Sequence, residues 1–331
     1  MSPSTVSRIL NSPDNSFASE EVRNRVWQVV QSVGYTPNET ARNLRMKKND
    51  KKLPSKTIAC IFARTKNPMD NPFFSQIARA IEQQAISMGY VVSYSFSAFD
   101  IENTSIIERI VSTSVDGVVV LGKFSTNIMR FLNHHYKNII YVGLNNIDVC
   151  WDQVICDGYE AAICAMRYLI KMGHHSIAYL GEIKNEVRFQ AYADALAETG
   201  IKLDKKLMVD CESGGSGGYT GALALLKSDA AVSAIFCIND ITAIAAIKYI
   251  RERKLNVPKD ISVISIDDIE MAQYVTPMLT TVKIPKSELG KMAVKTLVDR
   301  IERGHRLSMK VTLPHNLIIR ESVRAINKIH N

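Results

Sequence analysis

Apolar segments of strand length alternate with amphipathic segments of helical length after the first 56 residues. The pattern predicts strands at 57–62, 90–96 and 117–121, with helices at 73–88 and 101–112 between them. Strands that alternate with helices in this way form a parallel sheet covered by helices on both faces. This segment is therefore predicted to be a doubly wound α/β unit.

A second series of the same kind follows the strand predicted at 139–142. It begins with a strand at 154–156 and a helix at 159–172, and its further strands are predicted at 176–180, 207–209, 234–238 and 261–266. Open sheets seldom grow to the width that one sheet would need here. We therefore predict two Rossmann-like lobes with a ligand cleft between them.

The N-terminal residues differ from this pattern. Apolar residues at helical spacing predict short helices at 4–10 and 19–33, with a third at 38–46 after Pro37. The predicted division is an all-α head at 1–46, a linker at 47–56 and a two-lobe domain at 57–331. Its first lobe is expected at about 57–153 plus 285–312, and its second at about 154–284 plus 313–324.

Positive charge is concentrated near the N-terminus. The net charge is +8, and residues 1–56 hold ten Lys and Arg against five Asp and Glu, which accounts for +5. The densest part contains Arg42, Arg45, Lys47, Lys48, Lys51, Lys52 and Lys56. A polyanion such as nucleic acid is the partner that this distribution favours, although a solubility role stays open at this level.

The cysteines and the apolar runs indicate the compartment. Six cysteines without CxxC spacing are expected to be buried free thiols in a reducing environment. The chain contains no apolar run of the roughly 20 residues that cross a bilayer, and its N-terminus lacks signal-peptide features. A cytoplasmic location without membrane association is expected.

The sequence offers no catalytic constellation. The pairs His134–His135 and His174–His175 are adjacent, which does not place two imidazoles on one helix face, so surface or capping histidines are expected. The glycine-rich stretch 214–218 lacks the ending of a phosphate-binding loop and is predicted to be a flexible turn into the next helix. We expect neither an enzyme nor a bound cofactor or metal.

Residues 2–11 resemble the recognition helix of LacI/GalR repressors, and residues 34–38 with Ala41 and Leu44 resemble their hinge. Seven further short segments match sequence motifs of the family, and they occur in the same order along the chain: 71–74, 115–118, 156–162, 173–178, 239–240, 257–263 and 279–282. The resemblance implies a double-stranded operator as partner. The alternative for the N-terminal match is an ordinary amphipathic helix.

The resemblance assigns DNA contacts in the head. The implied set is Ser2, Ser4, Thr5, Ser7, Arg8, Asn11, Asn38, Ala41, Arg42 and Leu44. Short polar side chains and an arginine suit base edges and phosphates, and a leucine can wedge between base pairs in the minor groove. Leu44 could instead be a core residue.

The resemblance also implies a sugar or sugar-phosphate effector held between the lobes. Its implied ligands are Phe73, Phe74, Arg188, Asn239 and Asp267. The alternatives are an exposed helix position for the arginine and helix caps for the other two polar residues.

Three positions depart from the lactose-type site, with Leu121 and Gly143 in place of polar side chains and Ser213 in place of an aromatic one. Residues 121–124 are similar to a branch that includes galactose and β-galactoside regulators. A galactoside is therefore the expected effector.

The predicted function is that of a sugar-responsive DNA-binding regulator, most simply a homodimeric repressor of a carbohydrate-utilisation operon. No multi-heptad repeat follows Arg320, so a dimer is expected and not a tetramer. The sequence starts at the turn before the recognition helix, and from the resemblance we expect the first helix of the head to be missing. The alternative is a cytoplasmic sugar-binding protein without specific DNA binding.

Overall fold

The chain divides into two compact units, Met1–Leu53 and Pro54–Asn331. The computed structural model describes residues 2, 5, 6, 9, 18–32, 55–63, 71–97, 114–228 and 230–326. Within these residues, no helix is both long enough and apolar enough to cross a membrane. The helices predicted at 38–46 and 101–112 lie outside the described residues.

The described part of the N-terminal unit is helical. The helix α2 spans Glu20–Ser32, and the two glutamates at its start carry negative charge where the helix dipole favours it. Thr5 and Val6 also have helical backbone. Their N–H groups donate to the carbonyl oxygen of Ser2, which begins a helical turn there.

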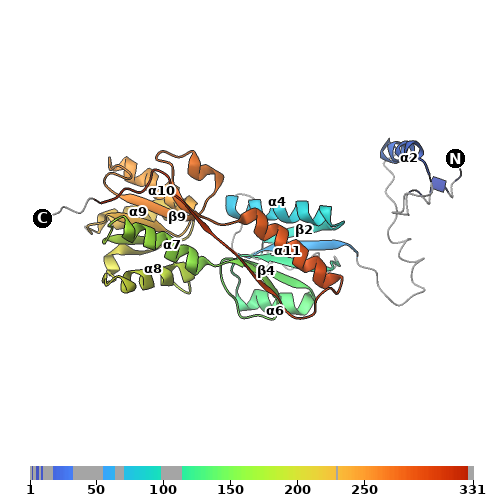
Figure 1. The fold of residues 1–331 in the computed structure, drawn as a ribbon, viewed down its shortest axis with the longest axis horizontal. Coiled ribbons are helices and arrows are strands. Elements are labelled where there is room, and N and C mark those ends of the chain that lie inside the picture. Colours follow the sequence, from blue (N-terminus) through green and yellow to red (C-terminus); the bar gives the residue numbers. More distant parts are fainter. Residues whose placement is uncertain are drawn as a thin grey trace. The chain divides into compact units, whose positions relative to one another are not determined.

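The larger unit contains two six-stranded sheets, one in each lobe (Figure 1). The first sheet has the order β11-β5-β4-β3-β1-β2, and all its strands are parallel. Its strands are β1 (Thr57–Phe62), β2 (Val91–Ser97), β3 (Gly117–Leu121), β4 (Ile139–Gly143), β5 (Asp152–Cys156) and β11 (Lys310–Leu313). The central strands are buried from end to end, as expected for a sheet covered on both faces.

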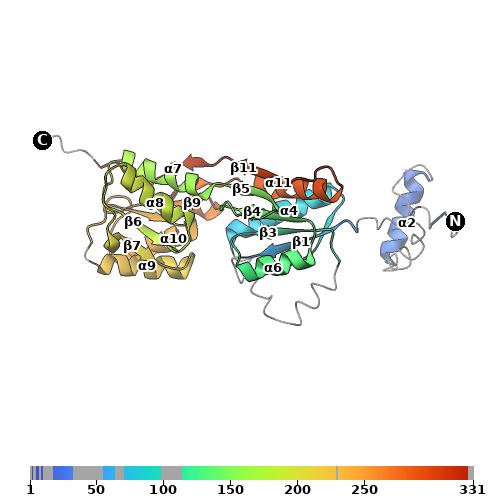
Figure 2. The same cartoon turned by 90° about the horizontal axis from the view of Figure 1, so that it is seen from below.

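Helices cover both faces of this first sheet (Figure 2). α4 (Pro72–Ser87) and α11 (Lys286–Ile301) pack against each other on one face, and α6 (Thr126–His135) lies on the other. Gly290 permits the close approach of α11 to α4, because a Cβ there would lie 2.7 Å from the carbonyl oxygen of Ile77.

The second lobe repeats the design. Its sheet has the order β12-β10-β9-β8-β6-β7, with only β12 antiparallel to its neighbour. The strands are β6 (Ile177–Gly181), β7 (Met208–Asp210), β8 (Ala234–Cys237), β9 (Ser262–Asp267), β10 (Thr280–Lys283) and β12 (Asn316–Ile318). One face carries α7 (Gly158–Lys171) and α8 (Val187–Glu198), and the other carries α9 (Gly215–Lys227) and α10 (Asp240–Glu252). Two short 3₁₀ helices, Lys205–Leu207 and Glu270–Gln273, complete the described elements of this lobe.

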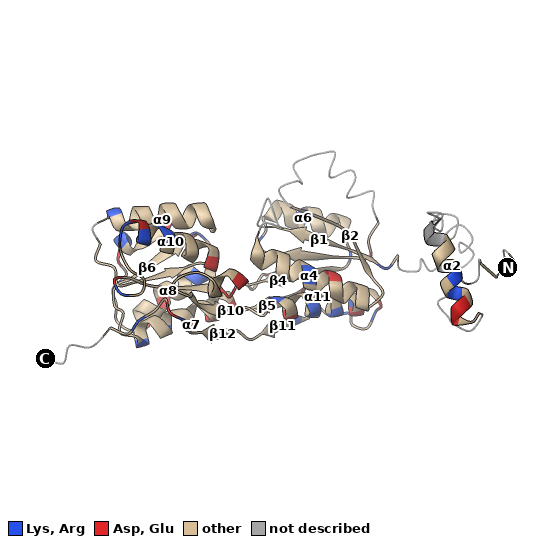
Figure 3. Ribbon diagram, turned by 90° about the horizontal axis from the view of Figure 1, so that it is seen from above, with Lys and Arg blue, Asp and Glu red and all other residues tan. Residues whose placement is uncertain are grey.

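Three short connections join the lobes. They run from β5 to α7, from β10 to α11 and from β11 to β12. The strand predicted at 154–156 was expected in the second lobe, and this expectation is wrong. β5 pairs with β4 on one side and β11 on the other, because β11 returns late in the chain to cover its outer edge. In Figure 3 the charged residues lie mainly on helices and loops, while the strands are mostly uncharged.

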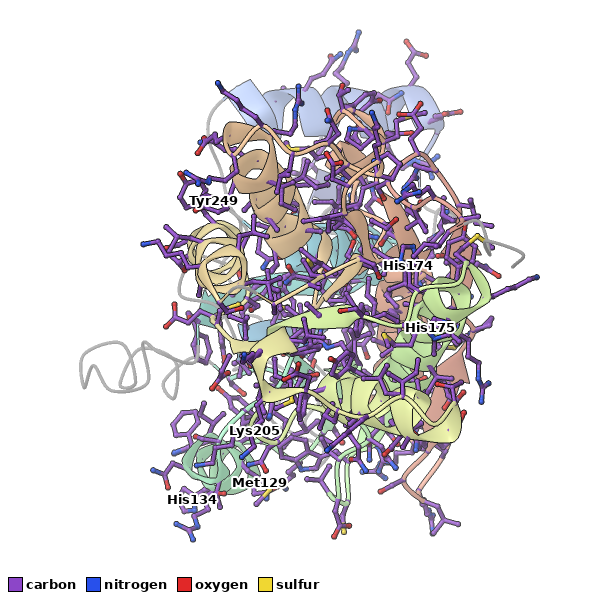
Figure 4. The ribbon with its side chains drawn as sticks, turned by 90° about the vertical axis from the view of Figure 1, so that its left-hand side faces the viewer. Met129, His134, His174, His175, Lys205 and Tyr249 are labelled. Atoms are coloured by element: carbon purple, nitrogen blue, oxygen red, sulfur yellow. The ribbon has the colours of Figure 1, made fainter. Side chains whose placement is uncertain are left out.

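Two further local expectations are corrected. The stretch 214–218 is not a flexible turn, since residues 215–218 form the first turn of α9, and a Cβ at Gly218 would collide with the backbone of Thr242. His174 is not a surface residue, although its backbone N–H donates to the carbonyl oxygen of Leu169 in the last turn of α7. It is 1% exposed, and its ring nitrogens lie 3.1 Å from the Ser233 hydroxyl and 3.1 Å from the Arg324 carbonyl oxygen. Burial lowers the pKa of His174. Figure 4 contrasts it with His134, which lies at the outer edge of α6.

The cysteines are free thiols, but they are not all buried. Cys60, Cys156 and Cys237 are buried in the cores, and burial raises the pKa of the Cys60 and Cys156 thiols to about 12. Cys150 is exposed, contrary to expectation, because it precedes the buried start of β5 in a surface loop.

Candidate functional site

A cavity of about 130 Å³ lies between the two lobes of the larger unit, at the carboxyl ends of the strands. Its lining comes from both lobes: Asn71, Phe73, Phe74, Gly122, Lys123, Tyr141, Gly143, Leu144, Asn145, Arg188, Ser213, Asn239 and Asp267. The carboxyl ends of parallel strands are the edge where such folds place ligands.

The start of α4 supplies the apolar wall of the cavity. Asn71 caps this helix, because its side-chain oxygen accepts hydrogen bonds from the N–H groups of Phe73 (3.0 Å) and Phe74 (3.4 Å). Pro72 occupies the first helical position, where its missing N–H is not needed. The two phenylalanine rings pack edge to face with centroids 5.2 Å apart. The cap therefore holds two aromatic rings against the cavity.

Arg188 brings a buried guanidinium to the opposite wall. Its side chain is 6% exposed, and its Nε lies 2.7 Å from Oε1 of Glu186, whose side chain is 1% exposed. Nη2 donates to Oε2 of Glu186 at 3.1 Å, and Nη1 donates to the carbonyl oxygen of Ile238 at 3.0 Å. Burial lowers the pKa of Arg188, but the carboxylate of Glu186 outweighs burial and raises it above its ordinary value. The side chain is therefore a fixed cation.

Asn239 and Asp240 join β8 to α10. Asn239 caps the helix by accepting from the N–H of Thr242 at 2.9 Å, which leaves its amide nitrogen as a donor for the cavity. Asp240 is fully buried and accepts hydrogen bonds from the hydroxyls of Ser265 and Thr281, each at 2.6 Å. Burial raises the pKa of Asp240 to about 6, against the effect of these hydrogen bonds.

Asp267 ends β9 in an unusual backbone conformation. Its φ is +127°, which side-chain-bearing residues rarely adopt, and Asp268 follows with φ +51°. The ammonium of Lys286, the first residue of α11, donates to the carbonyl oxygens of both residues. Arg320 adds an ion pair of 2.6 Å with Asp268. These contacts hold the strained turn that directs the Asp267 side chain to the cavity.

The structure brings together all five residues predicted to bind an effector, which line this one cavity: Phe73, Phe74, Arg188, Asn239 and Asp267. The alternative of an exposed Arg188 is excluded by its burial. Asn239 is a helix cap and a cavity residue at once. Of the three positions that depart from the lactose-type pattern, Gly143 and Ser213 line the cavity, whereas Leu121 is buried in the first lobe.

Sequence reasoning missed several residues around the cavity. The most important are Lys123, Glu186 and Lys286. A signal was available for Glu186, since a glutamate two residues before an arginine can cap a helix start and pair with the arginine at once. Lys123 and Lys286 act on backbone carbonyls of distant residues, and no local pattern marks such contacts.

The predicted DNA contacts lie mostly outside the described residues. Ser2 and Thr5 are described, and their hydroxyls lie 2.9 Å apart in the first helical turn. The remaining eight are not described: Ser4, Ser7, Arg8, Asn11, Asn38, Ala41, Arg42 and Leu44.

Two parallel-sheet lobes with a polar and aromatic cavity between them define a two-lobed small-molecule-binding protein. Family comparison supports this class, since residues 166–323 match the periplasmic binding protein-like domain. Residues 1–38 match the bacterial regulatory proteins of the lacI family. The chain belongs to the lacI family, whose members are DNA-binding transcriptional regulators.

Curated relatives match over nearly the whole chain. The repressor CytR of Escherichia coli is 31% identical over 98% of this chain and 94% of its own length. The repressor PurR of Erwinia tasmaniensis has the same identity and the same two coverages. The ribose operon repressor of Haemophilus influenzae is 28% identical over 98% and 96%.

Solved structures agree with the fold. A lacI-family regulator from Enterococcus faecium with bound ribose is 27% identical, with a TM-score of 0.71 over 82% of this chain and all of that one. The lac repressor dimer bound to operator has a TM-score of 0.78 at 21% identity, over 97% and 95% of the two chains. The second likeness concerns the fold alone.

Proposed function

We propose that this regulator represses a carbohydrate-utilisation operon and changes its affinity for operator DNA when a small sugar or sugar phosphate occupies the cavity. One observation carries the proposal: aromatic rings from one lobe and hydrogen-bonding side chains from the other line the same small cavity. A ligand that contacts both lobes stabilises one relative position of the lobes over others. The free energy of ligand binding thereby favours one arrangement of the two lobes.

The chemistry of the lining suits a sugar. Asp267 offers a carboxylate acceptor and Arg188 and Asn239 offer N–H donors, so that neighbouring hydroxyl groups of a sugar ring find both kinds of partner. The rings of Phe73 and Phe74 offer apolar surface for the C–H face of the ring. The ribose-bound relative supports a monosaccharide, and residues 121–124 favour a galactoside.

The partners of the protein follow from the family. The head, residues 1–46, is proposed to bind double-stranded operator DNA, and the basic segment 42–56 strengthens that binding through phosphate contacts. A homodimer is proposed because the lac repressor, which shares the fold, was solved as a dimer on its operator. Dimers of such regulators match the two half-sites of a palindromic operator.

Calorimetry and DNA binding test the proposal on the full chain. D-ribose, D-galactose and lactose are titrated into the protein, and fluorescence anisotropy then measures binding to the promoter of the neighbouring operon with and without the sugar that binds. We expect one sugar to bind and to change the affinity for DNA. Asp267→Asn should weaken sugar binding at least about tenfold, since it removes a charged acceptor.

The matched control is Asp148→Asn, which makes the same chemical change at an exposed position of the first lobe. It should leave both affinities unchanged. The proposal fails if no sugar binds, or if sugar binding leaves the affinity for DNA unaltered.

A further inference from the structure

The guanidinium of Arg188 is already occupied on its best hydrogen-bonding face. Nε and Nη2 form a two-pronged pair with the carboxylate of Glu186, at 2.7 Å and 3.1 Å. This is the fork geometry with which arginine otherwise binds a phosphate or carboxylate of a ligand. Nη1 uses one further N–H group to bind the carbonyl oxygen of Ile238. Of the five N–H groups of the guanidinium, one on Nη1 and one on Nη2 therefore remain for a ligand in the cavity.

Two kinds of interaction hold the Glu186 carboxylate in place, namely its pair with the Arg188 guanidinium and its cap of α8. Its side chain also accepts from the backbone N–H of Arg188 at 3.2 Å, so the same carboxylate caps α8. The N-terminus of a helix attracts anions through its free N–H groups and its dipole. At α8 this attraction is satisfied by the protein itself.

Two other helices that begin at the cavity, α4 and α10, are satisfied in the same way, whereas α9 begins after the lining residue Ser213 and has no side-chain cap. Asn71 caps α4 and Asn239 caps α10, each through its own side-chain oxygen, and both residues line the cavity. An incoming phosphate would have to displace these caps to reach the backbone N–H groups behind them. None of the three capped helix starts therefore presents a ready anion site.

The remaining charges at the cavity also balance. Among the described residues that line it, the cations are Lys123 and Arg188 and the anion is Asp267. Lys123 donates to the carbonyl oxygen of Asn185 at 2.5 Å, and Glu186 behind the wall supplies the second negative charge. Behind the wall, the ammonium of Lys286 lies near the carboxylates of Asp240 and Asp268. The cations around the cavity therefore do not outnumber the carboxylates, and the wall offers a ligand no net positive charge.

We infer that the effector is an uncharged sugar and not a sugar phosphate or sugar acid, and that Glu186 determines this preference by occupying the fork of Arg188. The inference rests on the proposed function, since it names the class of ligand for the same cavity. The two N–H groups of Arg188 that remain are donors suited to hydroxyl oxygens. A phosphate would add negative charge beside Glu186 and Asp267 in a partly desolvated site, which is unfavourable.

The experiment compares matched pairs of probes on the full chain by calorimetry and thermal shift. The pairs are D-ribose with D-ribose 5-phosphate and D-galactose with D-galactose 6-phosphate, with inorganic phosphate as a third probe. We expect the free sugar of the binding pair to bind at least about tenfold more tightly than its phosphate, because of the added repulsion. Tighter or equal binding of the phosphate overturns this inference and leaves the proposed function intact. Binding of none of these sugars and phosphates refutes both.

Glu186→Gln then tests the residue itself, because glutamine keeps the shape and a capping oxygen but removes the charge. The preference for the free sugar should shrink by about tenfold or more, as a phosphate gains an unpaired guanidinium. Glu198→Gln, on the same helix but exposed at 54%, is the matched control and should keep the wild-type preference. A variant that loses stability with an unchanged preference overturns the specificity role, and the wild-type comparison holds even if the variant does not fold.

Discussion

The ammonium of Lys123 lies 2.5 Å from the backbone carbonyl oxygen of Asn185, and this hydrogen bond joins the two lobes beside the cavity. Lys123 follows β3 in the first lobe, and Asn185 precedes α8 in the second. Asn185 has φ +53°, a left-handed conformation that asparagine tolerates better than most residues. The contact favours the relative position of the lobes in which the cavity is formed.

Lys123→Met should therefore weaken effector binding. The substitution keeps most of the aliphatic chain but removes a charge-assisted hydrogen bond between the lobes, so the closed arrangement is less populated and affinity falls by about tenfold. Calorimetry with the sugar that binds measures the change. Lys295→Met, at an exposed position on α11, is the control. Equal affinities in the two variants would show that the contact does not stabilise the bound arrangement.

Arg188→Ala should lower stability as well as abolish sugar binding. The substitution removes the guanidinium that offsets the buried negative charge of Glu186. Breaking a buried pair costs about 3–5 kcal/mol, whereas replacing both members with apolar residues costs much less. Urea unfolding of Arg188→Met, Glu186→Met and the double variant measures the coupling between the two residues. The double variant should be more stable than Arg188→Met and should still fail to bind sugar; additive losses would contradict the account.

His305 should make the folding free energy depend on pH. Its Nδ1 lies 2.5 Å from Asp299 and its Nε2 lies 3.0 Å from the buried carboxylate of Asp152, which Arg300 also contacts. Burial lowers the pKa of His305, but the hydrogen bonds to the two aspartates outweigh burial and raise it above 6.5.

A folded-state pKa above the unfolded one means that this stabilisation is complete below the unfolded value. It is lost as the pH rises through the folded-state pKa. Thermal unfolding measured between about pH 5.5 and 8.5 should therefore show a decline that is shallower in His305→Gln. His134→Gln, at an exposed position on α6, should keep the wild-type slope. Identical slopes in the wild type and His305→Gln would rule out this contribution.

The protein should sediment as a dimer of its 37.0 kDa chain. Met271 and Tyr274 are 53% and 71% exposed in one segment of the second lobe, and large apolar side chains exposed together mark contact surfaces. Tyr274→Glu should weaken the dimer, as judged by sedimentation velocity over a range of concentrations. Leu203→Glu, also at an exposed apolar position of that lobe, should not. A wild-type monomer or tetramer would refute the prediction.

Much of the larger unit could be predicted because its strands are buried on both faces. Runs such as 117–121 and 177–181 are apolar throughout, and each predicted strand of the second lobe appears within a residue or two of its expected position. The assignment of β5 to the second lobe was wrong, because β5 pairs with β4, the strand just before it in the chain, and with β11. The pairing with β11 spans about 150 residues, and no local pattern in the sequence shows it.

The site was predictable where it follows strand ends and not where it depends on distant contacts. Asn239 and Asp267 each lie at the end of a predicted strand, and the topology brings such ends to one edge. The burial of Arg188 depends on Glu186, and the conformation of Asp267 depends on Lys286 at the start of α11. Side chains that bind backbone carbonyls of residues far away in the chain produce no recognisable residue pattern in the sequence.

The three connections between the lobes determine which relative motions of the lobes an effector can change. A single linker would let one lobe swivel about many axes, and the ligand would then select among many arrangements. Three short connections from neighbouring strands oppose twisting and leave bending about one line as the low-energy motion. The response to an effector is thereby reduced to a single coordinate, the angle between the two lobes, and a ligand can change only that angle.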